Sequence, residues 1–507
     1  MRQISEAIVK IPYAEFFESD KAPRLRTRSA TESRWLFIVL TLLSVAPFWT
    51  VRYPLICDYP NHLARWFVLY HWRDPLYHFS ALYVPAWGPL PYVTPDLLAV
   101  AFQHILSIDV VGRCILSLCV VSVGFAGFLF LRKACPENSS LALFGILVAF
   151  NPMFLLGSIS YELSLALCLL TVGFWVSYCS SGRVRTALCV LVGLLLTYFT
   201  HLMGLLLAGL VMGVYALFQA SRWKKLGMLA ILSGPPLAVM GYTLLQGSAV
   251  SGYFGFADLT AWDKFRNLVF PVRLFSSKLL DAVVLAVLAI LVVLLARAQQ
   301  RIRIQPAWLA VCVVLLLVYL ASPTTAYVDC RVMPFLFFFA LPVFRFPRIP
   351  RYTLVLLALL VVFRIATVER LFIVEQPKLQ ELTAAFGAIP QDAKVLQIGV
   401  ANVDRGLLEG RGPTYHLFYG VIRRGFLAPQ LYHLPGVQPI RLSGDMYCPN
   451  VLCDVENPSD PEWRRIALSY DYLYVQKDWV VPPFPAWFAD LVFSNEYVAV
   501  YRVKRQE

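Results

Sequence analysis

Apolar stretches long enough to cross a bilayer recur along most of the chain and are separated by short polar segments. A helical span needs about 20 apolar residues. The stretches lie at 35–52, 110–131, 141–157, 162–180, 184–201, 203–220, 226–246, 278–297, 306–321, 332–346 and 352–373. This pattern predicts an all-α polytopic membrane domain over residues 35–373, with about eleven transmembrane helices at that length per span.

The pattern changes after residue 373. Alternating segments at 394–400, 470–475 and 497–502 predict β-strands, and the segments 378–388 and 461–469 predict helices. Residues 374–507 are therefore expected to form a small soluble α/β domain. Residues 1–34 are polar and are expected to form an N-terminal tail ahead of the first span.

Composition and charge placement support a membrane protein and exclude a nucleic-acid-binding surface. The chain is 59% hydrophobic and 15% charged, and its net charge of +13 is divided among short clusters between the apolar stretches. If all the spans are real, every cluster falls on the side of the N-terminal tail: Arg132/Lys133, Arg183/Arg185, Arg222/Lys224/Lys225, Arg297/Arg301/Arg303 and Arg345/Arg348/Arg351. The positive-inside rule then predicts a cytoplasmic N-terminus and a periplasmic C-terminal domain. No outward Asn-x-Ser/Thr site occurs, which favours a bacterial inner membrane.

The first outward loop, 52–109, holds an unusual group of titratable residues. Its segments around 60–72 and 95–108 are expected to be helices that lie along the membrane interface. Asp58 precedes Tyr59-Pro60, so it either caps a helix or binds and deprotonates an acceptor hydroxyl. His62 lies one turn later and is either a ligand, a proton carrier or a hydrogen-bonded interfacial residue. An Asp/His pair also suits a divalent cation, Mg²⁺ or Mn²⁺, with Asp58 and Asp74 as the carboxylate ligands.

Other outward groups suit phosphate or substrate binding. Arg331 either binds a phosphate or forms an ion pair with Asp329, and Lys264, Arg266 and Arg273 either share that task or contact lipid headgroups. Glu162 at the start of a span either caps a helix or contacts substrate, and His201 at a tight outward turn is either structural or functional. Cys448 and Cys453 are the two cysteines placed for a disulfide bridge in an oxidising compartment.

Three strings, Asp58-Tyr-Pro-Asn-His-Leu-Ala-Arg65, Tyr198-Phe-Thr-His201 and Asp329-Cys-Arg331-Val-Met-Pro334, together with this architecture, resemble the GT-C superfamily of integral-membrane glycosyltransferases. The resemblance implies transfer of a sugar from a polyprenyl-phosphate donor to a lipid or glycan acceptor on the periplasmic face. It also implies that Asp58 activates the acceptor and that outward Arg or Lys side chains hold the donor phosphate. Members usually carry paired acids in this loop, whereas Asp58 stands alone here.

A lipid or glycan transporter, or a polysaccharide-assembly protein without transfer chemistry, is the alternative. That class predicts charged residues within several spans and inverted repeats. The sequence offers only Arg113 and Arg364 as intramembrane charges and shows no repeat.

Overall fold

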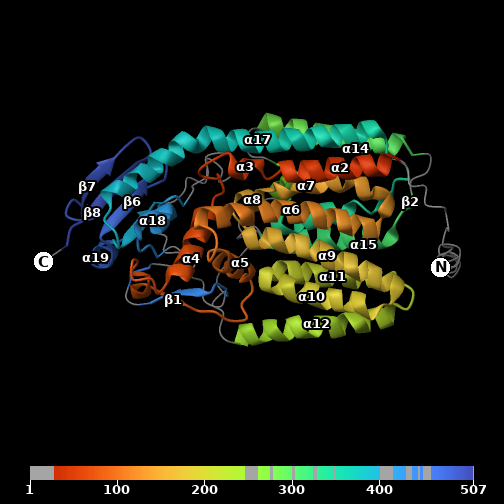
Figure 1. The fold of residues 1–507 in the computed structure, drawn as a ribbon, viewed down its shortest axis with the longest axis horizontal. Helices are drawn as coiled ribbons and strands as arrows, with labels where there is room; N and C mark the ends of the chain where they lie inside the picture. The colour runs from red at the N-terminus through yellow and green to blue at the C-terminus, as the bar shows by residue number, and fades with distance from the viewer. Residues whose placement is uncertain are drawn as a thin grey trace.

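Most of the chain forms one elongated bundle of near-parallel helices, with a small β-sheet at the end opposite the N-terminus (Figure 1). In this computed structural model the described residues are 28–245, 261–273, 278–299, 303–323, 328–347, 349–399, 415–429, 437–443, 446–448 and 458–505. The bundle helices are α2 (Arg28–Leu43), α3 (Ala46–Trp49), α6 (Ile108–Ala134), α7 (Leu143–Ala149), α8 (Pro152–Leu155), α9 (Ile159–Ser181), α10 (Val184–Thr200), α11 (Leu202–Leu217), α12 (Arg222–Leu245), α14 (Lys278–Arg297), α15 (Pro306–Ala321), α16 (Met333–Ala340) and α17 (Arg351–Ala384).

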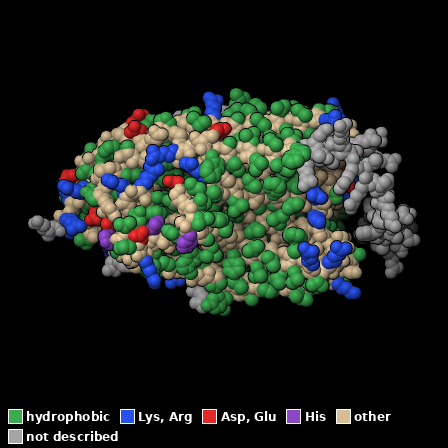
Figure 2. Space-filling model, viewed as in Figure 1, with side chains coloured by type: hydrophobic (Ala, Val, Ile, Leu, Met, Phe, Trp, Pro, Cys, Tyr) green, Lys and Arg blue, Asp and Glu red, His purple; other side chains and the backbone are tan. Residues whose placement is uncertain are grey.

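Each predicted span contains a helix. Among the described residues, five helical segments are long and apolar enough to cross a membrane: Ile108–Ala134, Pro136–Leu155, Ile159–Ser181, Arg222–Leu245 and Leu279–Arg297. Shorter apolar segments accompany them at Trp35–Trp49, Val184–Thr200, Leu202–Leu217, Pro306–Ala321 and Cys330–Ala340. Figure 2 shows the consequence at the surface, a broad hydrophobic belt with charged side chains gathered at its two ends. The chain is an integral, multi-pass membrane protein, and the number of crossings and their orientation stay predictions.

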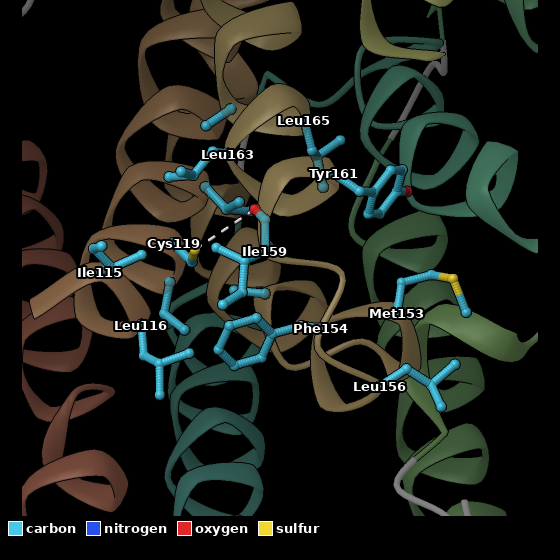
Figure 3. Close-up of a cluster of buried hydrophobic side chains, with 14 of the residues drawn as sticks. Ile115, Leu116, Cys119, Met153, Phe154, Leu156, Ile159, Tyr161, Leu163 and Leu165 are labelled. Atoms are coloured by element: carbon cyan, nitrogen blue, oxygen red, sulfur yellow. Dashed lines mark hydrogen bonds between the residues drawn. The ribbon is translucent and has the colours of Figure 1, made fainter. Parts of the chain in front are cut away.

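Helix α9 lies in the interior of the bundle, where it packs against α6, α10 and α11. Its first residue, Ile159, meets Phe154 and the α6 residues Leu116 and Cys119 in a buried apolar cluster (Figure 3). The Cys119 thiol lies 3.9 Å from the Ile159 carbonyl oxygen, a weak contact between the two helices. This packing holds the N-terminal end of α9 in place, which matters because the polar residues described below gather there.

The first outward loop folds into α4 (Tyr59–His71), β1 (Tyr83–Pro85) and α5 (Thr94–Phe102). Helix α4 was expected along the interface, but it is largely buried, covered by α5, α6 and α18 (Leu417–Arg424). A buried ion pair joins α4 to α5, because Arg65 Nε lies 2.7 Å from Asp96 Oδ1. Trp66 Nε1 donates to the same oxygen at 3.0 Å. Removing one partner of a buried pair leaves an uncompensated charge, so this contact ties the two helices together.

The C-terminal region is a four-stranded mixed sheet in the order β4-β6-β8-β7, with α19 (Asp460–Ser469) before β6. Strand β4 (Val395–Ile398) runs parallel to β6 (Tyr472–Gln476), whereas β8 (Val498–Val503) is antiparallel to both β6 and β7 (Ala489–Ser494). The three predicted strands are confirmed, and β7 was not anticipated. Cys448 is disulfide-bonded, while Cys453 lies outside the described residues, so their pairing stays a prediction.

Two connections join the C-terminal region to the membrane helices, across the domain boundary expected at residue 374. Helix α17 continues without a break from Arg351 to Ala384 and carries the chain directly into the sheet. Strand β1 of the first loop also pairs antiparallel with β5 (Ile440–Leu442), with Tyr83 opposite Leu442. The first outward loop is therefore enclosed between the bundle and the C-terminal region. A final short ladder, β2 (Arg303–Ile304) with β3 (Phe344–Arg345), lies at the opposite end of the bundle (Figure 1).

Candidate functional site

The segment that enters α9 brings Asp58 to the start of that helix. Asn151 caps α8 by accepting the Met153 N–H at 2.9 Å, and the turn that follows ends at Gly157, whose φ is +93°. A Cβ on Gly157 would lie 2.7 Å from the Asp58 Cβ and 2.8 Å from its backbone nitrogen. Only glycine adopts this conformation and leaves this space without strain. The close approach seats Asp58 against the turn.

Asp58 occupies the residue before α4, but its side chain makes no capping hydrogen bond to that helix. Its backbone N–H instead donates to the Leu156 carbonyl at 3.1 Å, and the residue is half-buried. The neighbouring Cys57 thiol is buried, and burial together with the Asp58 carboxylate raises the pKa of that thiol. The simple helix-cap interpretation of Asp58 is therefore not realised, because its carboxylate is not used to hold the helix end.

His62 links α4 to the same turn through both ring nitrogens. Arg65 Nη2 lies 3.0 Å from Nδ1, and Nε2 lies 2.9 Å from the Gly157 carbonyl oxygen. A guanidinium only donates, so Nδ1 accepts and the Nε2–H donates to Gly157. Burial, followed by the Arg65 charge, lowers the pKa of His62 from 6.5 to about 3, against the opposing effect of the Gly157 carbonyl. A neutral imidazole with both nitrogens occupied positions the turn that carries Asp58, and this favours the hydrogen-bonded alternative for His62 over a proton carrier.

We expect His62 to make the stability of the protein sensitive to acid. Because its folded-state pKa is about 3 and the ordinary value is 6.5, the unfolded chain binds more protons between those pH values. The free energy of unfolding therefore falls as the pH falls from 6.5 towards 3. His62→Gln should show a shallower fall in melting temperature over the same range, measured in detergent. His78→Gln, at an exposed imidazole, is the matched control, and parallel curves for wild type and His62→Gln would refute the prediction.

Gly157→Ala should displace Asp58 and lower both stability and activity. The added methyl group meets the Asp58 backbone at under 3 Å, and an L-residue in this conformation costs about 1–3 kcal/mol. Gly209→Ala in α11 is the control, since nothing lies within 4 Å of a Cβ added there. Thermal unfolding in detergent compares the two variants. Equal melting temperatures would mean that the turn tolerates a side chain and does not constrain Asp58.

A second group of residues lies one turn along α9. The Tyr161 hydroxyl donates to the Arg331 carbonyl at 2.7 Å, and its ring points away from Ile159 in Figure 3. The His201 ring lies 5.7 Å from the Tyr161 ring and 4.5 Å from the Tyr92 ring, centroid to centroid. Arg331 interacts electrostatically with both His201 and Tyr92. Three segments that are distant in sequence thus converge around the Arg331 guanidinium.

The hydrogen-bond donors of Arg331 and His201 are suited to bind an anion. Arg331 forms no ion pair with any described residue, and its buried Nε has no hydrogen-bond partner among them. His201 Nδ1 accepts the Met203 N–H at 3.1 Å, so the neutral ring carries its proton on Nε2. The alternative for Arg331, an ion pair with Asp329, is not formed: Asp329 accepts the Cys330 N–H at 2.8 Å instead. Burial raises the pKa of Asp329, which the Cys330 N–H and Lys264 oppose.

The other predicted phosphate ligands have structural partners. Lys264 Nζ donates to the carbonyls of Leu320 and Ser322, both at 2.9 Å, and so caps the end of α15. Arg273 Nε lies 3.5 Å from Asp281 Oδ2. Arg266 belongs to α13 (Ala261–Asn267), and its side chain lies outside the described residues. Of the predicted phosphate ligands, Lys264, Arg273 and Arg331 have described side chains. Lys264 binds a helix end and Arg273 binds a carboxylate, whereas Arg331 has neither kind of partner among the described residues.

Glu162 and Asp74 are both occupied elsewhere. Glu162 is fully buried, and its Oε2 accepts from the Asn151 side chain at 2.8 Å, so it braces the turn before α9. Asp74 Oδ2 lies 2.9 Å from His71 Nδ1. Across the part of the chain that the structure describes, no group of three or more His, Cys, Asp or Glu side chains is placed to hold a metal ion.

Tyr92 was missed as a site residue. Its φ of +72° is rare for a residue with a side chain, and strained backbone of this kind clusters at functional sites. Burial raises the pKa of its hydroxyl, and the Arg331 charge opposes this. The only signal in the sequence is its position at the end of the Pro-rich run Tyr83–Tyr92, which predicts an irregular turn but not its neighbours.

No protein-family model matches the chain, and no curated protein matches it. Among solved structures, the chain is similar to ArnT from Cupriavidus metallidurans, crystallised with undecaprenyl phosphate bound. The alignment covers 93% of this chain and 98% of the ArnT chain, with a TM-score of 0.55 and 11% sequence identity. Likeness at this identity concerns the fold alone. The chain therefore has the fold of this ArnT structure over nearly its whole length.

Proposed function

We propose that the protein is a membrane glycosyltransferase that moves a sugar from a polyprenyl-phosphate donor to the hydroxyl of a lipid or glycan acceptor. The observation that carries this proposal is that a carboxylate, Asp58, and Arg331, which forms no ion pair among the described residues, both lie near the start of α9. Asp58 contacts the turn at Leu156–Gly157, and the Arg331 backbone is bonded to Tyr161 one helical turn later. Both residues therefore contact the N-terminal end of α9.

The reaction needs one bond formed and one broken. The acceptor oxygen attacks C1 of the sugar, the bond between C1 and the phosphate oxygen breaks, and the polyprenyl phosphate leaves with that electron pair. The Asp58 carboxylate takes the proton of the acceptor hydroxyl as its oxygen becomes bonded to carbon. That carboxylate is half-buried beside the turn at Gly157 and makes no capping hydrogen bond to α4.

Negative charge develops on the leaving phosphate, and the Arg331 group is suited to stabilise it. A guanidinium forms paired hydrogen bonds to phosphate oxygens. The His201 Nε2–H has no partner among the described residues and adds a second donor. Donors that are held in place before the reaction cost little reorganisation as charge develops. Tyr92 and Tyr161 pack around His201 and keep the ring in position.

A protein-held divalent cation does not fit the described side chains. Among the described residues Asp58 belongs to no group of three or more possible ligand side chains, and both nitrogens of the nearby His62 are already bonded. Mg²⁺ and Mn²⁺ bind through several oxygen ligands. The mechanism proposed here therefore uses Asp58 as a base and assigns no step to a metal.

The proposed site faces the periplasm, with the N-terminus in the cytoplasm. The disulfide at Cys448 supports this orientation, because disulfides persist in oxidising compartments. The basic clusters of the sequence fall at the opposite ends of the same spans, where Lys and Arg are retained on the cytoplasmic side.

Incubation of the purified full-length protein with radiolabelled polyprenyl-phosphate sugars tests the proposal. Release of free polyprenyl phosphate together with labelled acceptor supports it, and lipid extracts from bacterial membranes supply the acceptor. Absence of turnover with every donor and with a full set of extracted acceptors would contradict it and would favour a transporter.

A further inference from the structure

Two arginines from distant parts of the sequence stack on one tyrosine, where the C-terminal region joins the first membrane helices, and a third arginine contacts the backbone two residues before that tyrosine. We call Arg52, Arg113 and Arg423 the arginine patch. The guanidinium carbons of Arg52 and Arg423 lie 5.4 and 4.9 Å from the centroid of the Tyr53 ring. Arg113 Nη2 donates to the Val51 carbonyl at 3.2 Å, next to Arg52 in the chain. Figure 2 shows Lys and Arg side chains gathered at the edge of the hydrophobic belt in this part of the molecule.

No described carboxylate forms an ion pair with the arginine patch. Arg52 and Arg423 are exposed and Arg113 is half-buried, and none of the three forms an ion pair among the described residues. Asp109, one turn before Arg113 on α6, is exposed and forms no ion pair with them. Three arginines without an ion-pair partner among the described residues leave positive charge at this surface. Like charges held this close repel one another, so an external anion bound between them would stabilise the arrangement.

The surface beside the arginine patch is apolar. Trp49 is 44% exposed, its Nε1 donates to Ser117 Oγ at 3.1 Å, and the Arg113 guanidinium lies 5.9 Å from its ring. Exposed leucines continue along the adjoining faces of α2 and α6: Leu42, Leu43 and Leu118. Tryptophan with a polar contact above and apolar neighbours below is typical of the membrane–water boundary. Cations beside such a tryptophan are suited to contact lipid phosphates.

We propose that the arginine patch binds the phosphate of an anionic phospholipid, with its acyl chains along the exposed face of α2 and α6. Guanidiniums pair with phosphate oxygens, and the adjoining leucines are in place to receive the chains. Since Arg423 belongs to α18 and the other two arginines to the bundle, the bound lipid connects the C-terminal region to the membrane helices. This site does not depend on the proposed transfer activity.

Titration of the purified full-length protein with phosphatidylglycerol in detergent, followed by native mass spectrometry, tests the site. We expect a saturable lipid adduct, and we expect Arg52→Gln to weaken it several-fold and the Arg52→Gln/Arg423→Gln pair about tenfold or more. The Arg52 side chain makes no hydrogen bond among the described residues, so the single variant should fold normally. Melting temperatures check that both variants are folded.

Arg424→Gln is the matched control, because it removes the same charge from the next residue of α18. Lipid binding that resists the Arg52 and Arg423 substitutions would overturn the proposal. So would an equal loss in Arg424→Gln, which would indicate attraction by net charge alone. Equal binding of phosphatidylcholine would also overturn the proposal. So would displacement of phosphatidylglycerol by millimolar inorganic phosphate, which would show that the site binds free phosphate.

Discussion

Asp58→Asn should lower the rate of sugar transfer by a factor of about 10²–10⁴, the usual contribution of a positioned general base. The amide cannot take up the acceptor proton, whereas its size and shape match those of the carboxylate. The fold should survive, because the Asp58 side chain makes no capping bond to α4 and Asn is itself favourable at that position. Transfer of radiolabelled sugar by purified variants measures the effect.

Asp74→Asn is the control for this experiment. Asp74 is a carboxylate of the same outward loop, paired with His71 at 2.9 Å. We expect that variant to keep most of its activity. If Asp58→Asn transfers sugar at the wild-type rate while remaining folded, Asp58 is not the base and the mechanism is wrong at that step.

Arg331→Gln should lower the transfer rate about 10²–10³-fold, the loss that follows removal of one preorganised donor to a developing negative charge. The Arg331 Nε is buried and lacks a hydrogen-bond partner among the described residues, so the side chain is available to a phosphate. Arg331→Lys keeps the charge but not the paired donors and should recover only part of the rate. Release of polyprenyl phosphate from the labelled donor reports the rate directly.

A binding measurement separates the role of Arg331 from a structural one. The affinity of the protein for undecaprenyl phosphate should fall in Arg331→Gln and recover partly in Arg331→Lys, while the melting temperature changes little. Arg73→Gln, at an exposed arginine that stacks on Trp72 in the same outward loop, is the control and should bind normally. Unchanged affinity in Arg331→Gln would remove Arg331 from the phosphate site.

The helices were predictable because the solvent constrains them. In a bilayer every backbone N–H and C=O must be bonded within the protein, so an apolar stretch of sufficient length forms a helix. For that reason each predicted span contains a helix in the structure. Strands β4, β6 and β8 were visible through their alternating residues. Strand β7 was not, and neither was the pairing of β1 with β5, since register across more than 350 residues leaves no local pattern.

The sequence offered candidate site residues, but it gave no information on which of them contact one another. Asp58 stood out because a carboxylate followed by Tyr59-Pro60 marks a helix start after a membrane span. Lys264 and Arg273 looked equivalent to Arg331 in the sequence, and the structure separates them. Lys264 caps α15 and Arg273 pairs with Asp281, whereas Arg331 forms no ion pair with a described residue and lies near His201 and Tyr92.

By itself the sequence determined that this protein is a helical membrane protein with a small α/β region at its C-terminus. The length of an apolar stretch and the spacing of apolar residues within a segment decide whether that segment forms a helix or a strand, and both can be read locally. Only the tertiary structure decided which polar groups have partners. His62 is held neutral by burial and by the Arg65 charge, and its ring is held in place by the carbonyl of Gly157, a residue 95 positions away. Tyr92, His201 and Arg331 meet because three separate segments pack against α9. Such contacts depend on the whole packing of the bundle, and no local stretch of sequence encodes them.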